Sequence, residues 1–183
     1  TSFLLQHSDE REVGADAAII LTRGNESKVA VFEAKWPRFD DRGYAWDYAQ
    51  TATGLSHFSD QLERQKRWLK SFAVFEMFYS EHPFGMQPSF LDPEGSSCVW
   101  HEDADAFRMR RTRPDEVWNQ GDLEGLLRIK RVSIAEVMTE FGLCNQGTPI
   151  PISEPRVIGD EFQLPRRVIA VKARGERVRK RIR

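Results

Sequence analysis

Two carboxylates and one lysine stand near the start of the chain at a spacing that suits hydrolytic chemistry. Sixteen residues separate Asp16 from the triplet Glu33, Ala34 and Lys35. Side chains alternate between faces along a β-strand, so Glu33 and Lys35 would project to one side, about 7 Å apart. A polar turn between the two segments would bring Asp16 beside them. We therefore predict one cluster of two carboxylates and an ammonium group.

The predicted cluster has the composition of a metal-assisted hydrolytic site. Asp16 and Glu33 lie at the edges of apolar runs, where folding removes carboxylates partly from water. Two like charges in such a place are unfavourable unless a cation neutralises them, and a hard divalent ion prefers oxygen ligands. Lys35 next to that ion would orient or deprotonate a water, or stabilise a phosphorane. These are the parts that phosphodiester hydrolysis needs.

The segments around the cluster predict two strands at the middle of a sheet. Residues 13–21 and 28–34 are apolar and partly β-branched, and the polar residues 22–27 between them are typical of a turn. An antiparallel hairpin follows from this pattern. Pro37 is expected to end the second strand because proline cannot donate to a sheet ladder.

A helix is predicted next, starting at Ser56 or Ser59 as its cap. Its apolar stripe recurs every three or four residues at Phe58, Leu62, Gln65, Leu69 and Phe72. Gln61 and Gln65 are four apart and share a face. Gln65 lies in the apolar stripe and so needs a polar partner, which the carboxylates, the lysine or a bound water of the cluster would provide.

The rest of the chain predicts a single α/β domain with a mixed sheet. We expect strands at 73–79, 96–100 and 167–172, a short helix within 114–127, and a helix that Ser133 caps and Gly142 ends. Residues 82–95 and 149–155 show no regular pattern. The domain would comprise a core of about residues 1–80, an elaboration of about 81–165 and a basic tail of about 166–183.

The acid–acid–lysine pattern resembles the PD-(D/E)XK phosphodiesterase superfamily, the restriction-endonuclease-like nucleases. Asp16 matches the first acid of that motif, Glu33 the second, and Lys35 the lysine. The resemblance covers roughly residues 10–80 and implies a mixed sheet flanked by helices, with Mg²⁺ or Mn²⁺ as the cofactor and DNA as the expected substrate. The sequence does not distinguish DNA from RNA, or single from double strands. It also implies that Asp16, Glu33 and the carbonyl of Ala34 bind the metal, and that Gln61 and Gln65 support the site.

The match departs from the superfamily pattern at two points. A Gly-Ala pair, not a proline, precedes Asp16. Many members also carry another acid on a helix ahead of the first strand, and here Glu12 or Glu10 is the available substitute. The chain opens with Thr1 and not Met, so we expect it to be a fragment whose missing part is a further possible source of that acid.

The charge distribution adds a candidate nucleic-acid contact. Residues 166–183 carry nine Lys and Arg against Glu176 alone, while the whole chain has a net charge of −1. A basic tail of this kind can neutralise phosphates, although a solvated end or a clamp on the protein's own acidic surface would have the same composition. No apolar run is long enough to cross a bilayer. Cys98 and Cys144 are expected to be free thiols.

Several functional interpretations remain open from the sequence. The resemblance admits a toxin domain with a dedicated immunity protein, or an anti-phage or restriction nuclease, acting on cytoplasmic DNA in either case. A nucleic-acid-binding module or a protein-interaction domain with the same fold and no catalysis is the alternative. Trp36, directly after Lys35, is a candidate for stacking on bases. The oligomeric state is not indicated.

Overall fold

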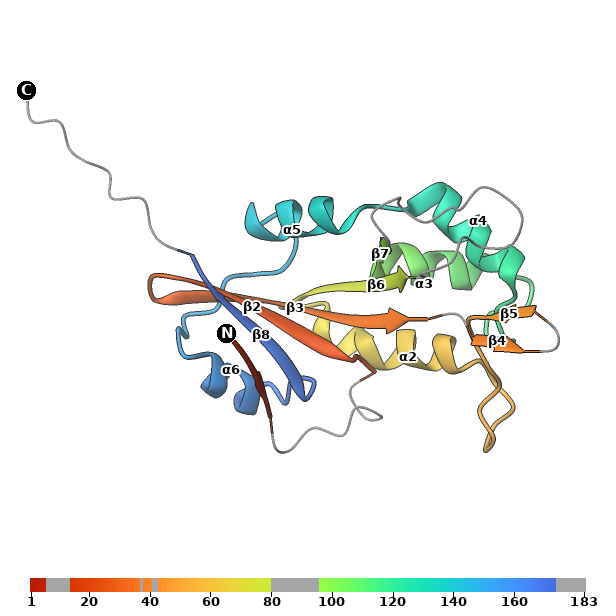
Figure 1. Ribbon diagram of the computed structural model, residues 1–183, viewed down its shortest axis with the longest axis horizontal. Helices are drawn as coiled ribbons and strands as arrows, with labels where there is room; N and C mark the ends of the chain where they lie inside the picture. Colours follow the sequence, from red (N-terminus) through yellow and green to blue (C-terminus); the bar gives the residue numbers. More distant parts are fainter. Residues whose placement is uncertain (6–13, 37, 41–42, 80–95, 174–183) are drawn as a thin grey trace, which may run out of the picture.

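The protein folds around a six-stranded mixed sheet (Figure 1). The computed structural model describes residues 1–5, 14–36, 38–40, 43–79 and 96–173. In the sheet order β1-β8-β2-β3-β6-β7, the pairs β2–β8 and β3–β6 are parallel and the others antiparallel. The strands span β1 (Ser2–Leu4), β2 (Ala17–Arg23), β3 (Glu26–Lys35), β6 (Ala73–Tyr79), β7 (Ser96–Trp100) and β8 (Arg167–Lys172), and β4 (Arg38–Asp40) and β5 (Gly43–Ala45) form a separate hairpin. The prediction of an α/β fold with a mixed sheet is confirmed.

The central pair of the sheet is the predicted antiparallel hairpin, β2 and β3. Its pairing runs from Ala17 opposite Phe32 to Arg23 opposite Glu26, so the turn is shorter than the predicted 22–27. Gly24 adopts a φ of 64°, which glycine tolerates without steric cost. The polar residues on either side continue the strands because β-pairing satisfies their backbone groups.

Helices lie on both faces of this sheet (Figure 1): α2 (His57–Gln65) and α6 (Pro155–Glu161) on one, α5 (Ile134–Gly142) on the other. Beyond β7, α3 (His101–Arg110) and α4 (Gln120–Lys130) pack against α2 through an apolar cluster. Both faces of the sheet are therefore buried. No helix in the described part of the chain is long and apolar enough to cross a membrane.

Several predicted helix boundaries are correct and one is wrong. Ser56 caps α2 by accepting a hydrogen bond from the backbone N–H of Ser59 at 2.8 Å. The expected continuation of this helix to Phe72 is wrong: α2 ends at Gln65, and a short 3₁₀ turn, η1 (Lys66–Trp68), follows. The chain must reverse here to enter β6, which runs parallel to β3.

Some of the remaining elements were predicted and others were not. Ser133 and Gly142 bound α5 as expected, and β8 lies where a last strand was predicted. The helix expected within 114–127 is α4, which begins after Asn119 and ends at Lys130, beyond the expected range. The elements β1, β4, β5, α3 and α6 were not predicted. Cys98 and Cys144 are free, as expected; Glu10, Glu12 and residues 82–95 and 174–183 lie outside the described residues.

Candidate active site

Asp16 is held where the pairing of β2 with β3 ends. Its backbone N–H donates to the carbonyl of Phe32 at 2.9 Å. Its carboxylate oxygen Oδ2 accepts from the backbone N–H of Ala34 at 2.8 Å. The side chain thus accepts the hydrogen bond that a backbone carbonyl of the β2 chain would accept if the β2–β3 pairing continued. This bond holds the Asp16 carboxylate at the triplet that contains Glu33 and Lys35.

Glu33 and Lys35 form a buried ion pair that a glutamine closes into a triangle. The ammonium Nζ of Lys35 lies 3.0 Å from Oε1 of Glu33, and the two residues are only 7% and 6% exposed. Gln61 on α2 accepts from Lys35 through its amide oxygen and donates to Glu33 through its amide nitrogen. The structure therefore brings Asp16, Glu33, Lys35 and Gln61 together.

Gly14 allows the segment before Asp16 to approach α2 closely. Its φ is 71°, and a Cβ at this position would lie 3.1 Å from both the carbonyl oxygen of Gln61 and the Cβ of Arg64. Its own carbonyl accepts from Nε2 of Gln65 at 2.7 Å. A side chain at position 14 would push the segment that carries Asp16 away from α2. The Gly-Ala pair that precedes Asp16 thus has a structural reason.

Gln65 has different partners from those expected. It is fully buried, and its amide oxygen lies 2.8 Å from Nδ1 of His101. Its amide nitrogen donates to Gly14 and makes a longer contact, 3.4 Å, with Oε2 of Glu76. Gln65 therefore ties α2 to β6, to α3 and to the segment before Asp16. Among the described residues its side-chain hydrogen bonds go to Gly14, Glu76 and His101 and not to the Lys35 ion pair.

Glu76 is a buried acid that the sequence prediction missed. It lies on β6 directly beside Glu33 on β3, so the two carboxylates share a face of the sheet. Glu76 and His101 are almost fully buried, and Oε1 of the acid and Nε2 of the imidazole make no hydrogen bond within the described residues. The available signal was one acid inside the apolar segment 73–79, because a buried charge needs a partner.

Glu33 is a buried carboxyl group whose pKa departs from its ordinary value. Burial raises the pKa of Glu33 from 4.5 to about 7; Lys35 opposes this rise, and the neighbouring charges of Asp16 and Glu76 add to it. An additional cation would relieve this repulsion. Among the described residues no three Asp, Glu, His or Cys side chains form a metal-binding group. The carboxylate oxygens of Asp16 and Glu33 at the end of the hairpin are nevertheless of the kind that a hard cation binds.

Aromatic side chains lie beside the cluster. The imidazole of His57, one helical turn before Gln61, stacks on Tyr48 with 4.5 Å between ring centroids. Burial lowers the pKa of His57, and the positive charges of Lys35 and Arg64 lower it further. Trp36 follows Lys35, is 44% exposed and meets Tyr79 edge-on.

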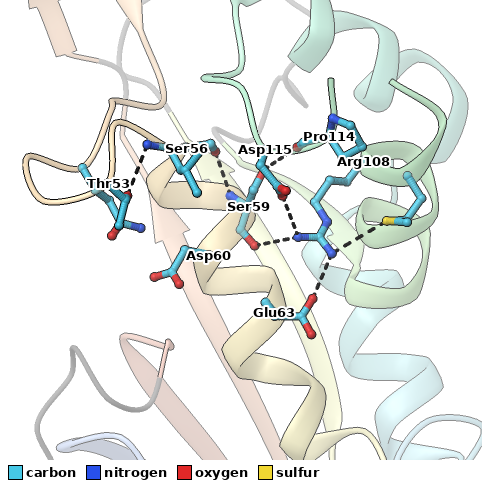
Figure 2. A pocket seen from close by; sticks show the side chains of 11 residues that line it. Thr53, Ser56, Ser59, Asp60, Glu63, Arg108, Pro114 and Asp115 are labelled. Carbon is cyan, nitrogen blue, oxygen red and sulfur yellow. Dashed lines mark hydrogen bonds and ion pairs between the residues drawn. The ribbon is translucent and has the colours of Figure 1, made fainter. Parts of the chain in front are cut away.

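The opposite flank of α2 borders a separate cavity of about 470 Å³ (Figure 2). Ser56, Ser59, Asp60 and Glu63 recur at helical spacing along it. Arg108 enters from α3 and bonds the Ser59 carbonyl, Glu63 and Asp115 (Figure 2). This cavity shares α2 with the acid–lysine cluster but none of its residues.

The fold and the cluster define an α/β protein with a mixed sheet and a buried acid–lysine site at the end of its central hairpin. No protein-family model, curated protein or solved structure matches this chain.

Proposed function

We propose that the protein is a divalent-metal-dependent nuclease that hydrolyses DNA phosphodiester bonds, with a restriction-endonuclease-like fold of the PD-(D/E)XK type. The observation that carries the proposal is the convergence of Asp16, Glu33 and Lys35 at one end of the central hairpin, with Gln61 bridging the ion pair. Acid, acid and lysine are the three functional positions of that motif. The central position of the β2–β3 hairpin and the adjacent helix α2 are consistent with it.

Mg²⁺ or Mn²⁺ suits the donors at this position. Asp16 and Glu33 would hold the ion together with the carbonyl of Ala34, because hard divalent cations favour carboxylate and carbonyl oxygens. The raised pKa of Glu33 is consistent with this assignment: burial is its largest cause, the charges of Asp16 and Glu76 add to it, and a cation at this position would favour the ionised carboxylate. A bound ion would supply Lewis-acid activation of the phosphate and of a water.

The chain's own residues have distinct roles in this proposal. Lys35 places a positive charge where a phosphate oxygen gains negative charge during attack by water. Gln61 holds the Lys35 ammonium and the Glu33 carboxylate in one orientation, so neither group has to reorganise when substrate binds. Gly14 and Gln65 hold the segment that presents Asp16.

The biological settings that we propose are a toxin domain neutralised by an immunity protein and an anti-phage or restriction nuclease, each acting on DNA inside a cell. A non-catalytic nucleic-acid-binding module is the competing function. Its binding would depend on the basic residues, of which the described part includes Arg166, Arg167 and Lys172, and it would need no metal.

The test is cleavage of supercoiled plasmid in Mg²⁺, Mn²⁺ or EDTA by the wild type, Lys35→Met and Asp16→Asn. Lys28→Met is the matched control: Lys28 is also a buried lysine of β3, and it donates to the carbonyls of Phe141 and Gln146, away from the cluster. We expect metal-dependent nicking that falls at least about 100-fold in the two site variants and persists in folded Lys28→Met.

Each other result has a distinct meaning. Metal-independent plasmid binding without cleavage in every metal would favour the binding module. Cleavage that survives in both Lys35→Met and Asp16→Asn would place the active site elsewhere. Equal losses in Lys28→Met and Lys35→Met would trace the effect to folding, which circular dichroism of each variant checks.

A further inference from the structure

A stacked pair of rings at the start of α2 presents an accessible aromatic surface. The rings of Tyr48 and His57 are 18° from parallel. Tyr48 is 43% exposed, whereas a phenol ring in a protein commonly buries most of its surface. Tyr48 therefore keeps a considerable accessible area, although His57 already contacts its ring.

The backbone around Tyr48 is tied firmly to α2. The N–H of His57 donates to the Tyr48 carbonyl at 2.9 Å. The carboxylate of the preceding residue, Asp47, accepts from the backbone N–H of Phe58 at 2.9 Å and from the hydroxyl of Ser56 at 2.6 Å. A ring held in this way loses little conformational entropy when a ligand stacks on it.

The stack lies beside the proposed active site on the Lys35 side. His57 and Gln61 are four residues apart and so share one face of α2, and Gln61 bonds Lys35 directly. The charge of Lys35 also contributes, after burial, to the lowered pKa of His57, which requires the two side chains to be near each other.

The charge state of the stack suits a neutral aromatic ligand. Because the pKa of His57 is lowered from 6.5, its imidazole is uncharged at pH 7. The neighbourhood thus offers a neutral aromatic surface next to an ammonium group. A nucleotide has the complementary parts, a flat base and an anionic phosphate joined by a sugar.

We propose that the Tyr48–His57 stack is a platform for one unpaired nucleobase of the strand whose phosphate lies at Lys35. The neighbouring pairs cover both faces of a base inside a duplex, so a protein ring reaches that face only when the base is unstacked. The substrate class is then nucleic acid with an unpaired segment. This inference rests on the proposed nuclease site. It adds a preference for unpaired over paired nucleic acid, which the acid–lysine cluster alone does not provide.

Binding to three fluorescein-labelled probes of equal length tests the platform: single-stranded oligothymidylate, the same strand annealed to oligoadenylate, and an abasic strand with the same phosphates. Anisotropy is measured in EDTA and in Ca²⁺. We expect the wild type to prefer oligothymidylate over the duplex and over the abasic strand. Tyr48→Ala should weaken oligothymidylate binding about tenfold and leave abasic binding unchanged.

Two variants separate the aromatic ring from the surface around it. Tyr48→Phe keeps the ring and should bind as the wild type does. Leu55→Ala removes an equally exposed, non-aromatic side chain from the loop before α2 and should have no effect. Undiminished oligothymidylate binding by Tyr48→Ala would overturn the inference, as would wild-type binding that does not distinguish thymidylate from abasic strand.

The failure of this inference can be told apart from failure of the nuclease proposal. Metal-dependent plasmid nicking combined with Tyr48-independent binding would overturn the platform and leave the nuclease standing. Ring-dependent binding of oligothymidylate without nicking in any metal would support the platform and overturn the nuclease.

Discussion

Two buried basic side chains flank α2, and one glutamate paired with each of them shows a pKa shift in the opposite direction from the other. On the sheet side, Lys35 pairs with Glu33, whose pKa burial raises to about 7. On the cavity side (Figure 2), Arg108 pairs with Glu63 at 2.9 Å. The pKa of Glu63 is lowered, mainly by a hydrogen bond from Lys66; burial opposes this lowering, and a hydrogen bond from Arg108 adds to it.

The difference comes from the burial of the acid and not from the number of ion pairs. The side chain of Glu63 is 58% exposed, so it keeps its hydration and gains two cations. Glu33 loses its hydration and has two further carboxylates nearby, which Lys35 alone does not offset. Glu63 is thus paired with cations while it stays hydrated, whereas the Lys35 cluster buries an acid whose ionisation is unfavourable. Such perturbed groups are candidates for function.

The largest expected effect is a loss of stability with rising pH that comes from Glu33. A carboxyl with a pKa of 4.5 when unfolded and about 7 when folded binds a proton more tightly in the folded state. Its protonation favours folding below this range, and that advantage is lost as pH rises from 4.5 through 7. Compared with Glu33→Gln, the wild type should lose on the order of 2–3 kcal/mol of unfolding free energy across this window.

Urea denaturation in EDTA from pH 4 to 8 measures that difference. Glu63→Gln is the matched control, because a lowered pKa stabilises the folded state above 4.5 and its effect is lost as pH falls below that value. If the unfolding free energies of the wild type and Glu33→Gln changed equally with pH, Glu33 would ionise normally and the two clusters would not differ.

Removal of the two cations should sharpen the contrast. Arg108→Met should cost about 2 kcal/mol at pH 5 and at pH 8 alike, since Glu63 remains ionised over that range. Lys35→Met should cost about 1–2 kcal/mol more at pH 8 than at pH 5, because the pKa of Glu33 rises further without Lys35 and only its ionised form needs the ammonium. Urea denaturation at the two pH values measures both, and a Lys35→Met cost that does not change with pH would contradict the contrast.

The smallest effect is stabilisation by metal at one cluster only. At pH 8, Mg²⁺ at ten times its dissociation constant should raise the unfolding free energy of the wild type by about 1.4 kcal/mol. Asp16→Asn and Glu33→Gln should abolish this gain, and Glu63→Gln should keep it. Thermal denaturation across a magnesium titration measures it without reference to cleavage. Equal stabilisation of all four proteins would place metal binding outside the cluster.

The local pattern of apolar and polar residues was sufficient to predict the strands and the helix that carry the site. The alternation of β3 places Glu33 and Lys35 on one face, and Ser56 begins α2 because its hydroxyl satisfies a free N–H of the first turn. Each of these outcomes depends on residues close together in the chain. The antiparallel hairpin followed for the same reason, from two apolar runs and a glycine turn.

The partners that complete the site come from distant parts of the chain and were missed. His101 contacts Gln65 across 36 positions, and Asp47 receives the N–H of Trp118 across 71. The end of α2 at Gln65 was also missed, because the apolar spacing that continues to Phe72 fits a helix until the chain has to enter β6.

The sequence by itself determined a mixed α/β sheet, a central hairpin and the approach of Asp16, Glu33 and Lys35, since strand alternation and a short turn fix these relations locally. Only the tertiary structure placed Glu76 beside Glu33, because strands distant in sequence pair through backbone groups that every residue carries. Tertiary packing also raised the pKa of Glu33, since dehydration depends on everything that covers the carboxylate. Whether the ionised form of an acid is favourable therefore depends on the burial and the neighbouring charges that the whole fold creates.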